Sequence, residues 1–513
     1  MEVVIAIDSS TTASKAVAFS LDGSVRAIGR APIQMSSPHP SWREQDAAEW
    51  WATTARALRD VSTRLSELGD EPVAIGITHQ RETFVLLDAS GLPVRKAILW
   101  MDSRSGAQVR SLGSPEVHAI SGKPPSTTPS FYKLAWLAEH EPALLRRAHR
   151  IADVHAALSL AMTDRFVTSS ASADPTGLVD HRTGEWSDRL MELASVRRDQ
   201  LPEIVQPGTV IGGLSGAAAE QTGLPSGLPV VAGGGDGQCA GLGSGVVGTG
   251  RAYLSLGTSI ALGTHADEVD PSPSFRVMAS PLGRGRTLDA FIASGSYSVA
   301  WFRRSFPMVA ADISAEESDP FELAIDRADG RMRGLMFVPH LSGAATPYWD
   351  DRLRGAFVGV SDDHTAAEFY RAVLEGLAYE IRMLCDGFER AGSPVETIAV
   401  TGGGTESHRW LRIIADVTGR PLTTARTTET TALGAGILAA AAVRFDGDIR
   451  SAADAMTAIE RTILPDPARA EHATELFAIF GKIARALTPI HIEASAIDPD
   501  RAVAPSSENR VSA

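Results

Sequence analysis

A strand-turn-strand pattern that occurs twice, far apart in the chain, constrains the fold more than any other feature. Residues 5–19, IAIDSSTTASKAVAF, contain two apolar runs around a turn of hydroxyl residues, and Asp8 ends the first run. Residues 252–264, AYLSLGTSIALGT, contain two apolar runs around a Gly-Thr-Ser turn. Apolar runs separated by such turns predict β-hairpins. Two copies predict two related domains that face a shared cleft, because the repeat is far too long for a solenoid.

The length of the chain agrees with a two-domain organisation. At 513 residues the chain exceeds what one ordinary hydrophobic core supports, so we expect domains over residues 1–248 and 249–490. A polar segment that contains Pro and Ser predicts a loose tail over residues 491–513. No apolar window of roughly 18 residues is free of charge, so no membrane span is expected.

Charge and cysteine content exclude some functions. The formal net charge of −14 gives no electrostatic signature for nucleic acid, although backbone amides and Mg²⁺ still allow phosphate binding. Cys239 and Cys385 are too few for a disulfide framework and fit a reducing cytoplasm. The N-terminus has neither the basic region nor the apolar core of a signal peptide, which also favours a cytoplasmic location.

Strands and helices alternate along the rest of the chain. In the first half we expect strands over residues 3–7, 16–20, 24–30, 73–77 and 83–88, and helices over 46–68, 131–147 and 187–195. Thr365 and Glu368 form a capping box for a helix that ends near Arg390. A strand over 396–404 leads into a helix that Ser407 caps, and the small apolar residues 431–443 predict a closely packed helix.

Two glycine runs are candidate ligand sites. Residues 233–238, GGGDGQ, follow an apolar strand, so the backbone can approach a ligand closely and Asp236 lies at the strand end. The alternative is that Asp236 serves only as the N-cap of the following helix. The run TGGGTES, residues 401–407, suits a nucleotide but also suits any tight strand-to-helix turn. It does not match the G-x-x-x-x-G-K-[ST] phosphate loop.

Polar residues after another strand suggest a second group of ligand contacts. Arg81 and Glu82 in THQRET can grip hydroxyl groups, because a guanidinium donates and a carboxylate accepts; the alternative is a surface ion pair. Trp100 offers an apolar wall, although a core tryptophan is the commoner case. The first hairpin turn is either an ordinary solvated turn or a phosphate cradle. The absence of H-E-x-x-H, Cys/His clusters and G-x-S-x-G argues against a zinc site or a serine hydrolase.

Taken in order along the chain, these segments resemble the FGGY family of carbohydrate kinases. The match extends from Ile5 to about Val443, and its most specific part is GAFVGVSDDHTAAEFYRAVLE, residues 355–375, which is similar to the family's C-terminal signature. The resemblance implies an α/β fold with two actin-like (ribonuclease-H-like) ATPase domains around a central cleft. It also implies a kinase that uses ATP and Mg²⁺ to phosphorylate a small sugar or polyol, and it suggests a homodimer.

The resemblance assigns roles to individual residues. Asp236 matches the catalytic base, which takes the proton of the acceptor hydroxyl, and Asp8 matches the acid that holds Mg²⁺, so the metal site is expected at Asp8 and Asp236. Nucleotide contacts are implied for Thr11, Thr12 and Lys15 in the first turn, for Gly257 and Thr258 in the second, and for Gly403, Gly404 and Ser407 near the adenosine. Substrate contacts are implied for Arg81, Glu82, Trp100, Asp236 and Gln238.

Two positions depart from the family pattern. Ser10 stands where the family usually has the glycine of D-x-G-T, which adds a side chain to the first turn. Gly237 separates Asp236 from Gln238, where a pair of polar residues often follows the catalytic acid. The path of the first turn and the contact made by Gln238 are therefore open questions.

The substrate signals point in two directions. THQRET and ILWMDSR resemble glycerol kinases, whereas SWREQDAAEWW, residues 41–51, and the signature region are more similar to xylulokinases. We expect D-xylulose or a related pentulose, with glycerol or another polyol as the alternative. An actin-like ATPase without sugar kinase activity is a further alternative, but such a protein needs neither the acid of GGGD nor the signature. A catalytically inactive relative would not need to keep both Asp8 and Asp236.

Overall fold

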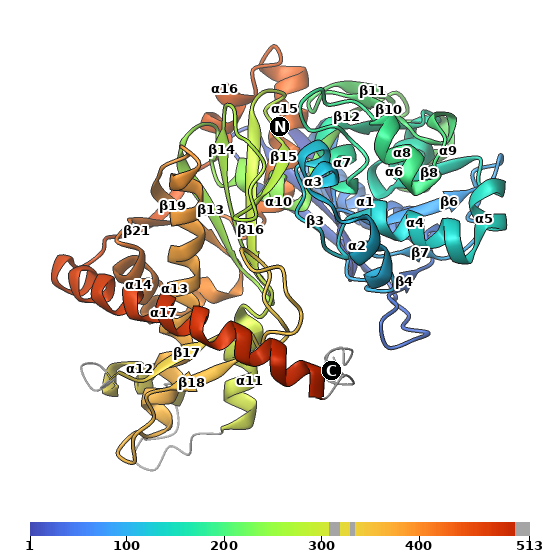
Figure 1. Ribbon diagram of the computed structural model, residues 1–513. Helices are drawn as coiled ribbons and strands as arrows, with labels where there is room; N and C mark the ends of the chain where they lie inside the picture. Colours follow the sequence, from blue (N-terminus) through green and yellow to red (C-terminus); the bar gives the residue numbers. More distant parts are fainter. Residues whose placement is uncertain (307–318, 329–333, 498–513) are drawn as a thin grey trace.

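The computed structural model describes residues 1–306, 319–328 and 334–497 and has two lobes (Figure 1). The first lobe is coloured mainly blue to green and the second mainly yellow-green to red. Helices α10 (Asp236–Gly243) and α15 (Thr430–Arg444) lie at their junction. Within the described ranges, no helix is both long and apolar enough to cross a bilayer.

The first lobe is built on a sheet whose strand order is β11-β12-β5-β1-β2-β3. The strands are β1 (Glu2–Ser9), β2 (Ala13–Ser20), β3 (Val25–Pro32), β5 (Glu71–His79), β11 (Val210–Gly213) and β12 (Pro229–Gly235). β1 runs antiparallel to β2 and parallel to β5, and β5 runs parallel to β12. The carboxyl ends of β1, β5 and β12 therefore meet at one edge, where ligands bind in α/β sheets.

The second lobe repeats this topology in the order β15-β16-β14-β13-β19-β20-β21. Its strands are β13 (Gly250–Leu256), β14 (Ile260–Ala266), β15 (Arg276–Ala279), β16 (Arg286–Ile292), β19 (Val395–Thr401), β20 (Leu422–Ala425) and β21 (Ile459–Ile463). β13 is antiparallel to β14 and parallel to β19, and β19 is parallel to β20. The series β3-β2-β1-β5-β12 thus corresponds to β16-β14-β13-β19-β20, which confirms the two related domains inferred from the two hairpins.

Smaller sheets and helices complete the first lobe. The strands are β4 (Glu44–Gln45), β6 (Phe84–Leu87), β7 (Ala97–Ile98) and β8 (Arg150–Asp153) in one sheet, and β9 (Val167–Ser169) and β10 (Glu203–Val205) in another. The helices are α1 (Ala48–Leu68), α2 (Gly106–Leu112), α3 (Pro115–Ser121), α4 (Ser130–His140), α5 (Pro142–Arg147), α6 (Val154–Thr163), α7 (Ser170–Ala173), α8 (Asp188–Ala194) and α9 (Gly216–Thr222). The helical pattern expected over 131–147 is confirmed as two consecutive helices: α4 ends before Pro142, whose missing amide hydrogen favours the start of α5.

Helices also cover the sheet of the second lobe. They are α11 (Ser296–Ser305), α12 (Pro320–Arg327), α13 (Ala366–Arg390), α14 (His408–Thr418) and α17 (Pro467–Ile497), with the strand pair β17 (Met336–Val338) and β18 (Ala356–Val358). Helix α16 (Ile449–Met456) packs instead on α15, in the core of the first lobe. The capping box of Thr365 and Glu368 is present at the start of α13. The expected tail over 491–513 is wrong for residues 491–497, which belong to α17. Residues 498–513 lie outside the described residues.

The two helices at the junction cross through small residues. A Cβ on Gly243 of α10 would lie 1.9 Å from the carbonyl oxygen of Thr430, and one on Gly434 of α15 would lie 2.0 Å from that of Cys239. α15 also packs against the first sheet, because a Cβ on Gly76 of β5 would lie 2.2 Å from the carbonyl oxygen of Ala435. Helix α15 therefore belongs to the core of the first lobe. The strands before and after it in the chain, β20 and β21, lie in the sheet of the second lobe.

Candidate active site

Two carboxylates lie at the same edge of the first sheet, at the ends of two strands that β5 separates. Asp8 is near the end of β1, and Asp236 is the first residue of α10, directly after β12. Burial and the nearby charge of Asp236 raise the pKa of Asp8 to about 7, whereas Lys15 acts in the opposite direction. Gly235, not Asp236, is the N-cap residue of α10, so the alternative of a purely capping role is wrong. The arrangement concentrates negative charge at one edge of the sheet.

The unpartnered oxygen of Asp8 tests whether this edge suits Mg²⁺. Its Oδ1 atom is buried, and no hydrogen-bond donor reaches it among the described residues. A buried carboxylate oxygen without a partner is costly, and a divalent cation removes that cost. No group of three or more metal-binding side chains occurs in the described part of the chain, but Mg²⁺ usually takes only one or two carboxylates and fills its shell with water and phosphate oxygens. Asp8 and Asp236 therefore fit Mg²⁺.

Side chains hold the first hairpin turn in place. The Ser10 hydroxyl donates to the carbonyl oxygen of Ala13 (2.8 Å), so the serine that replaces glycine braces the turn. Thr11 donates to Gln80 Oε1 (3.2 Å) and accepts from Trp100 Nε1 (3.0 Å). Trp100 is half-buried, and its indole connects the expected substrate side of the site with the expected phosphate side. The neighbouring Thr12 is exposed.

Lys15 is paired across the junction. Its ammonium group lies 2.5 Å from Glu429 Oε2, at the start of α15. Both side chains keep partial exposure, 26% for Lys15 and 19% for Glu429, so solvent and ligands can reach the pair. Lys15 is therefore positioned by a residue of the second half of the chain that sequence reasoning did not connect with it.

The second hairpin turn and the glycine loop lie on the other lobe. The carbonyl oxygens of Gly257 and Thr258 accept from the amides of Ser296 (2.9 Å) and Tyr297 (3.2 Å) at the start of α11. Thr258 is exposed. These contacts fix the turn through its backbone, in contrast to the side-chain contacts of the first turn.

The glycine loop follows β19. A Cβ on Gly404 would lie 2.6 Å from Leu256 Cβ, so this glycine lets the loop approach β13, whereas Gly403 faces open space. Ser407 accepts from the amide of Trp410 as the N-cap of α14, as expected, and donates to Glu322 Oε2 (3.0 Å). The exposed backbone of Gly403 is available to a ligand.

The glycines around Asp236 make room for Arg81. A Cβ on Gly235 would lie 2.3 Å from Arg81 Cγ, and one on Gly237 would lie 3.0 Å from Arg81 Nη2 and 3.0 Å from the Tyr253 hydroxyl. Arg81 crosses this cleared surface and pairs with Asp236 (Nε–Oδ1 3.1 Å). The departure at Gly237 thus has a structural reason, since a side chain there would push Arg81 aside.

Arg81 and Glu82 reach across to the second lobe. Arg81 also pairs with Asp289 (Nη1–Oδ1 3.4 Å), and Glu82 pairs with Arg276 (Oε1–Nη1 2.8 Å). The alternative of a surface ion pair is wrong, because Glu82 is only 4% exposed and the two residues bind different partners. Arg276 and Asp289 were not predicted from the sequence. The one sequence feature that points to them is that each is a charged residue in a largely apolar strand.

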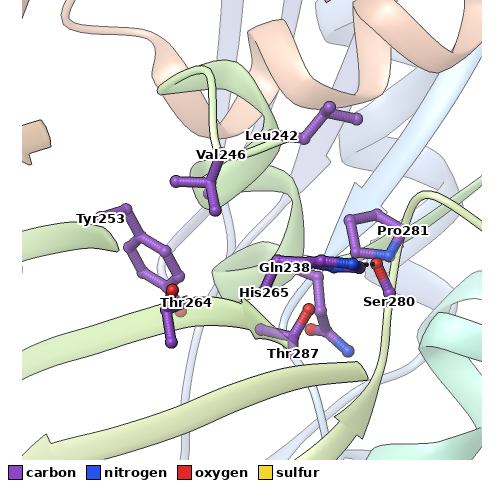
Figure 2. Close-up of a pocket in the computed structure, with 10 residues that line it drawn as sticks. Gln238, Leu242, Val246, Tyr253, Thr264, His265, Ser280, Pro281 and Thr287 are labelled. Atoms are coloured by element: carbon purple, nitrogen blue, oxygen red, sulfur yellow. Dashed lines mark hydrogen bonds between the residues drawn. The ribbon is translucent and has the colours of Figure 1, made fainter. Parts of the chain in front are cut away.

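Gln238 is turned into the protein interior. It is 1% exposed and donates through Nε2 to the carbonyl oxygen of Ala171 (2.8 Å). Figure 2 shows it among the residues that line a hollow between α10 and the second sheet, together with Tyr253 and His265. The hollow leaves only about 10 Å³ in which the centre of a water molecule can lie, which is room for about one water. It is therefore too small for a sugar.

Comparisons with known proteins assign both halves of the chain to one family. Residues 3–243 match the N-terminal domain of the FGGY family of carbohydrate kinases, and residues 252–443 match its C-terminal domain. The xylulose kinase of Escherichia coli (strain K12) is 30% identical over 82% of this chain and 85% of its own length. The glycerol kinase of Deinococcus radiodurans is 30% identical over 86% of this chain and 89% of its own. The crystal structure of ligand-bound xylulose kinase from Lactobacillus acidophilus has a TM-score of 0.89 at 22% identity, covering 96% of this chain and 100% of that one, which shows the shared two-domain fold.

Proposed function

This chain belongs to the FGGY family of carbohydrate kinases, which are ATP-dependent phosphotransferases, and we propose that its acceptor is D-xylulose or a related pentulose. The observation that carries the proposal is the position of Asp236, at a strand end beside Asp8 and bound to Arg81. A carboxylate in this position accepts the proton of the acceptor hydroxyl as that oxygen attacks the γ-phosphate.

We assign the metal and nucleotide contacts to residues of both lobes. Asp8 and Asp236 would hold Mg²⁺, which neutralises phosphate charge when it is bound. We assign the first turn, with Thr11, Thr12 and Lys15, and the second turn, with Gly257 and Thr258, to the phosphates. Gly403, Gly404 and Ser407 are assigned to the adenosine end. Phosphoryl transfer needs mainly positioning and charge neutralisation, which turns from both lobes supply.

The acceptor site is assigned to Arg81, Glu82 and Trp100. Arg81 donates and Glu82 accepts, and the Trp100 ring offers an apolar face, a combination that suits a small polyhydroxylated molecule. Gln238 is given no direct substrate contact here, because its side chain is buried and bound to Ala171. Glycerol is the second candidate, because a glycerol kinase matches this chain as closely as a xylulose kinase does.

A coupled ADP-release assay with Mg-ATP tests the acceptor. Ketopentoses, polyols and aldonates are compared at equal concentrations, and we expect the largest stimulation from D-xylulose or another pentulose. Stimulation by glycerol alone would replace the pentulose with a polyol. A complete absence of stimulation by every acceptor would contradict the proposed substrate class.

The Asp236→Asn variant tests the base. We expect phosphate transfer to fall by about 10²- to 10⁴-fold, the contribution of a general base, with ATP affinity nearly unchanged. Asp174→Asn is the matched control, because Asp174 is a buried carboxylate at the junction of the lobes that touches neither Asp236 nor Arg81 in any observed contact. Substantial turnover in the Asp236 variant would show that another group removes the proton.

A further inference from the structure

Two buried charges of the second lobe lie side by side at an edge of its sheet. Arg276 on β15 and Asp289 on β16 are direct cross-strand partners and form an ion pair. Arg276 is 4% exposed and Asp289 is 0% exposed. Buried ions need full compensation, because an uncompensated charge in a protein interior is strongly destabilising. Neither residue belongs to a turn or loop assigned to the nucleotide.

The compensation comes from the first lobe. Arg276 pairs with Glu82 (2.8 Å), and Asp289 pairs with Arg81 (3.4 Å) and accepts from the Tyr253 hydroxyl (3.1 Å). Each lobe thus contributes one cation and one anion, and the signs alternate from Glu82 through Arg276 and Asp289 to Arg81. We call these four residues the interdomain bridge.

The local backbone positions the side chains of the interdomain bridge. Glu82 has a φ of 59°, in the left-handed region that non-glycine residues rarely adopt, which breaks the alternation of an extended chain between Arg81 and Glu82. Gly235 and Gly237 clear the surface that Arg81 crosses, as described above. Arg81 therefore has a defined path that ends between Asp236 and Asp289.

We propose that Arg276 and Asp289 are positioning residues for the acceptor: they hold Glu82 and Arg81 in the geometry that binds it, so the acceptor site is complete only when both lobes contribute. This inference rests on the proposed function of Arg81 and Glu82. Arginine suits the task, because its planar fork serves two acceptors at once.

Asp289→Asn is the main test. The lost charge removes the ion pair with Arg81 and frees Arg81 to turn fully toward Asp236, so we expect the KM for the acceptor to rise by about 10- to 100-fold as Arg81 leaves the position in which it donates to the acceptor. The KM for ATP should change by less than about threefold, because the bridge does not touch the nucleotide turns. Arg276→Lys keeps the charge opposite Glu82 but loses the fork, and it should give an intermediate acceptor KM.

Asp174→Asn is the matched control. Asp174 is a 2% exposed carboxylate at the same junction, where it pairs with Lys123 (2.6 Å) and accepts from the amide of Ala279 (2.9 Å). Its loss should lower thermal stability much as Asp289→Asn does and should leave the acceptor KM near that of the wild type. Equal acceptor KM values in Asp289→Asn and Asp174→Asn would overturn the proposal.

Hydrogen exchange separates a failure of the bridge from a failure of the proposed function. In Arg276→Lys and Asp289→Asn, without any substrate, we expect faster amide exchange over residues 78–84, and no change there in Asp174→Asn. If the wild type accepts no sugar or polyol, the acceptor role is wrong, and faster exchange would leave only a structural bridge. If exchange over 78–84 is unchanged, the bridge does not position these residues, whatever the substrate is.

Discussion

The two hairpin turns have the same place in two copies of one topology, yet different side chains hold them. In the parallel pairing of the first sheet Asp8 lies opposite Thr78, and in the second sheet Ser255 lies opposite Thr401, so Asp8 and Ser255 are equivalent positions. The first turn carries an acid and is tied by side chains to Gln80 and Trp100, on the proposed substrate side of the site. The second turn is fixed by its backbone to α11. Duplication of the fold has therefore kept the framework and placed the acids in one copy only.

The comparison predicts unequal effects at equivalent positions. Asp8→Asn should weaken activation by Mg²⁺ by about 10- to 100-fold, as loss of a residue that holds the metal through water typically does. Ser255→Ala, at the equivalent strand position, should stay close to the wild type. Mg²⁺ titrations of the kinase rate measure both variants. Similar losses in the two variants would mean that the lobes share the metal chemistry.

At the crossing of α10 and α15, glycine substitutions in the two halves of the chain should have similar effects on stability. Gly243→Ala and Gly434→Ala should each lower the free energy of unfolding by about 1–3 kcal/mol or more, because each new methyl group meets a backbone carbonyl. Gly481→Ala in α17 is the control, since its Cβ would come no closer than 3.5 Å to any atom outside its own helix backbone. Denaturant unfolding compares the three variants. Tolerance at one glycine alone would mean that the crossing is not symmetric.

A buried histidine makes the first sheet sensitive to acid. His155 Nε2 accepts from the amide of Gly233 (3.3 Å), and burial lowers the pKa of His155 from 6.5 to about 4. The unfolded chain therefore binds more protons than the native protein between these values, so the stability that His155 contributes is lost as pH falls from 6.5 toward 4. Thermal unfolding from pH 7 to about pH 4.5 should show a shallower loss in His155→Gln than in the wild type. Identical slopes would assign the acid sensitivity to other groups.

The smallest expected effect comes from making the first turn more like the second. Ser10→Gly removes the hydrogen bond to Ala13 and should lower the free energy of unfolding by about 0.5–1.5 kcal/mol. The KM for ATP should remain near the wild-type value, because Ser10 already adopts the turn without a left-handed backbone. A large rise in that KM would show that Ser10 contacts the phosphates and does more than brace the turn.

Local patterns predicted most of the elements, whereas contacts between distant residues stayed hidden. The two hairpins, the capping box at Thr365 and the cap at Ser407 depend on neighbouring residues, and the structure confirms them. The pairing of Arg276 with Glu82 joins residues 194 positions apart, and no local pattern reports such a distance.

The candidate site was predicted unevenly for the same reason. Asp8 and Asp236 end apolar strands, so their convergence follows from parallel pairing. The burial of the Gln238 side chain and the pairing of Lys15 with Glu429 depend on packing between distant parts of the chain. The cleared path of Arg81 also explains Gly237, which the sequence marked only as a departure from the family pattern.

The place of α15 has a consequence for how the protein is made. The first sheet takes its strands from residues 2–235, but apolar residues of α15, such as Ala435 and Leu438, complete its core. A ribosome must therefore synthesise the chain through residue 444 before this core can close. Until then β1 and β5 present an uncovered apolar face, so the first lobe depends on the second during synthesis. A fragment cut at residue 248 would keep that face uncovered and would need a chaperone or a separately supplied second half to stay in solution.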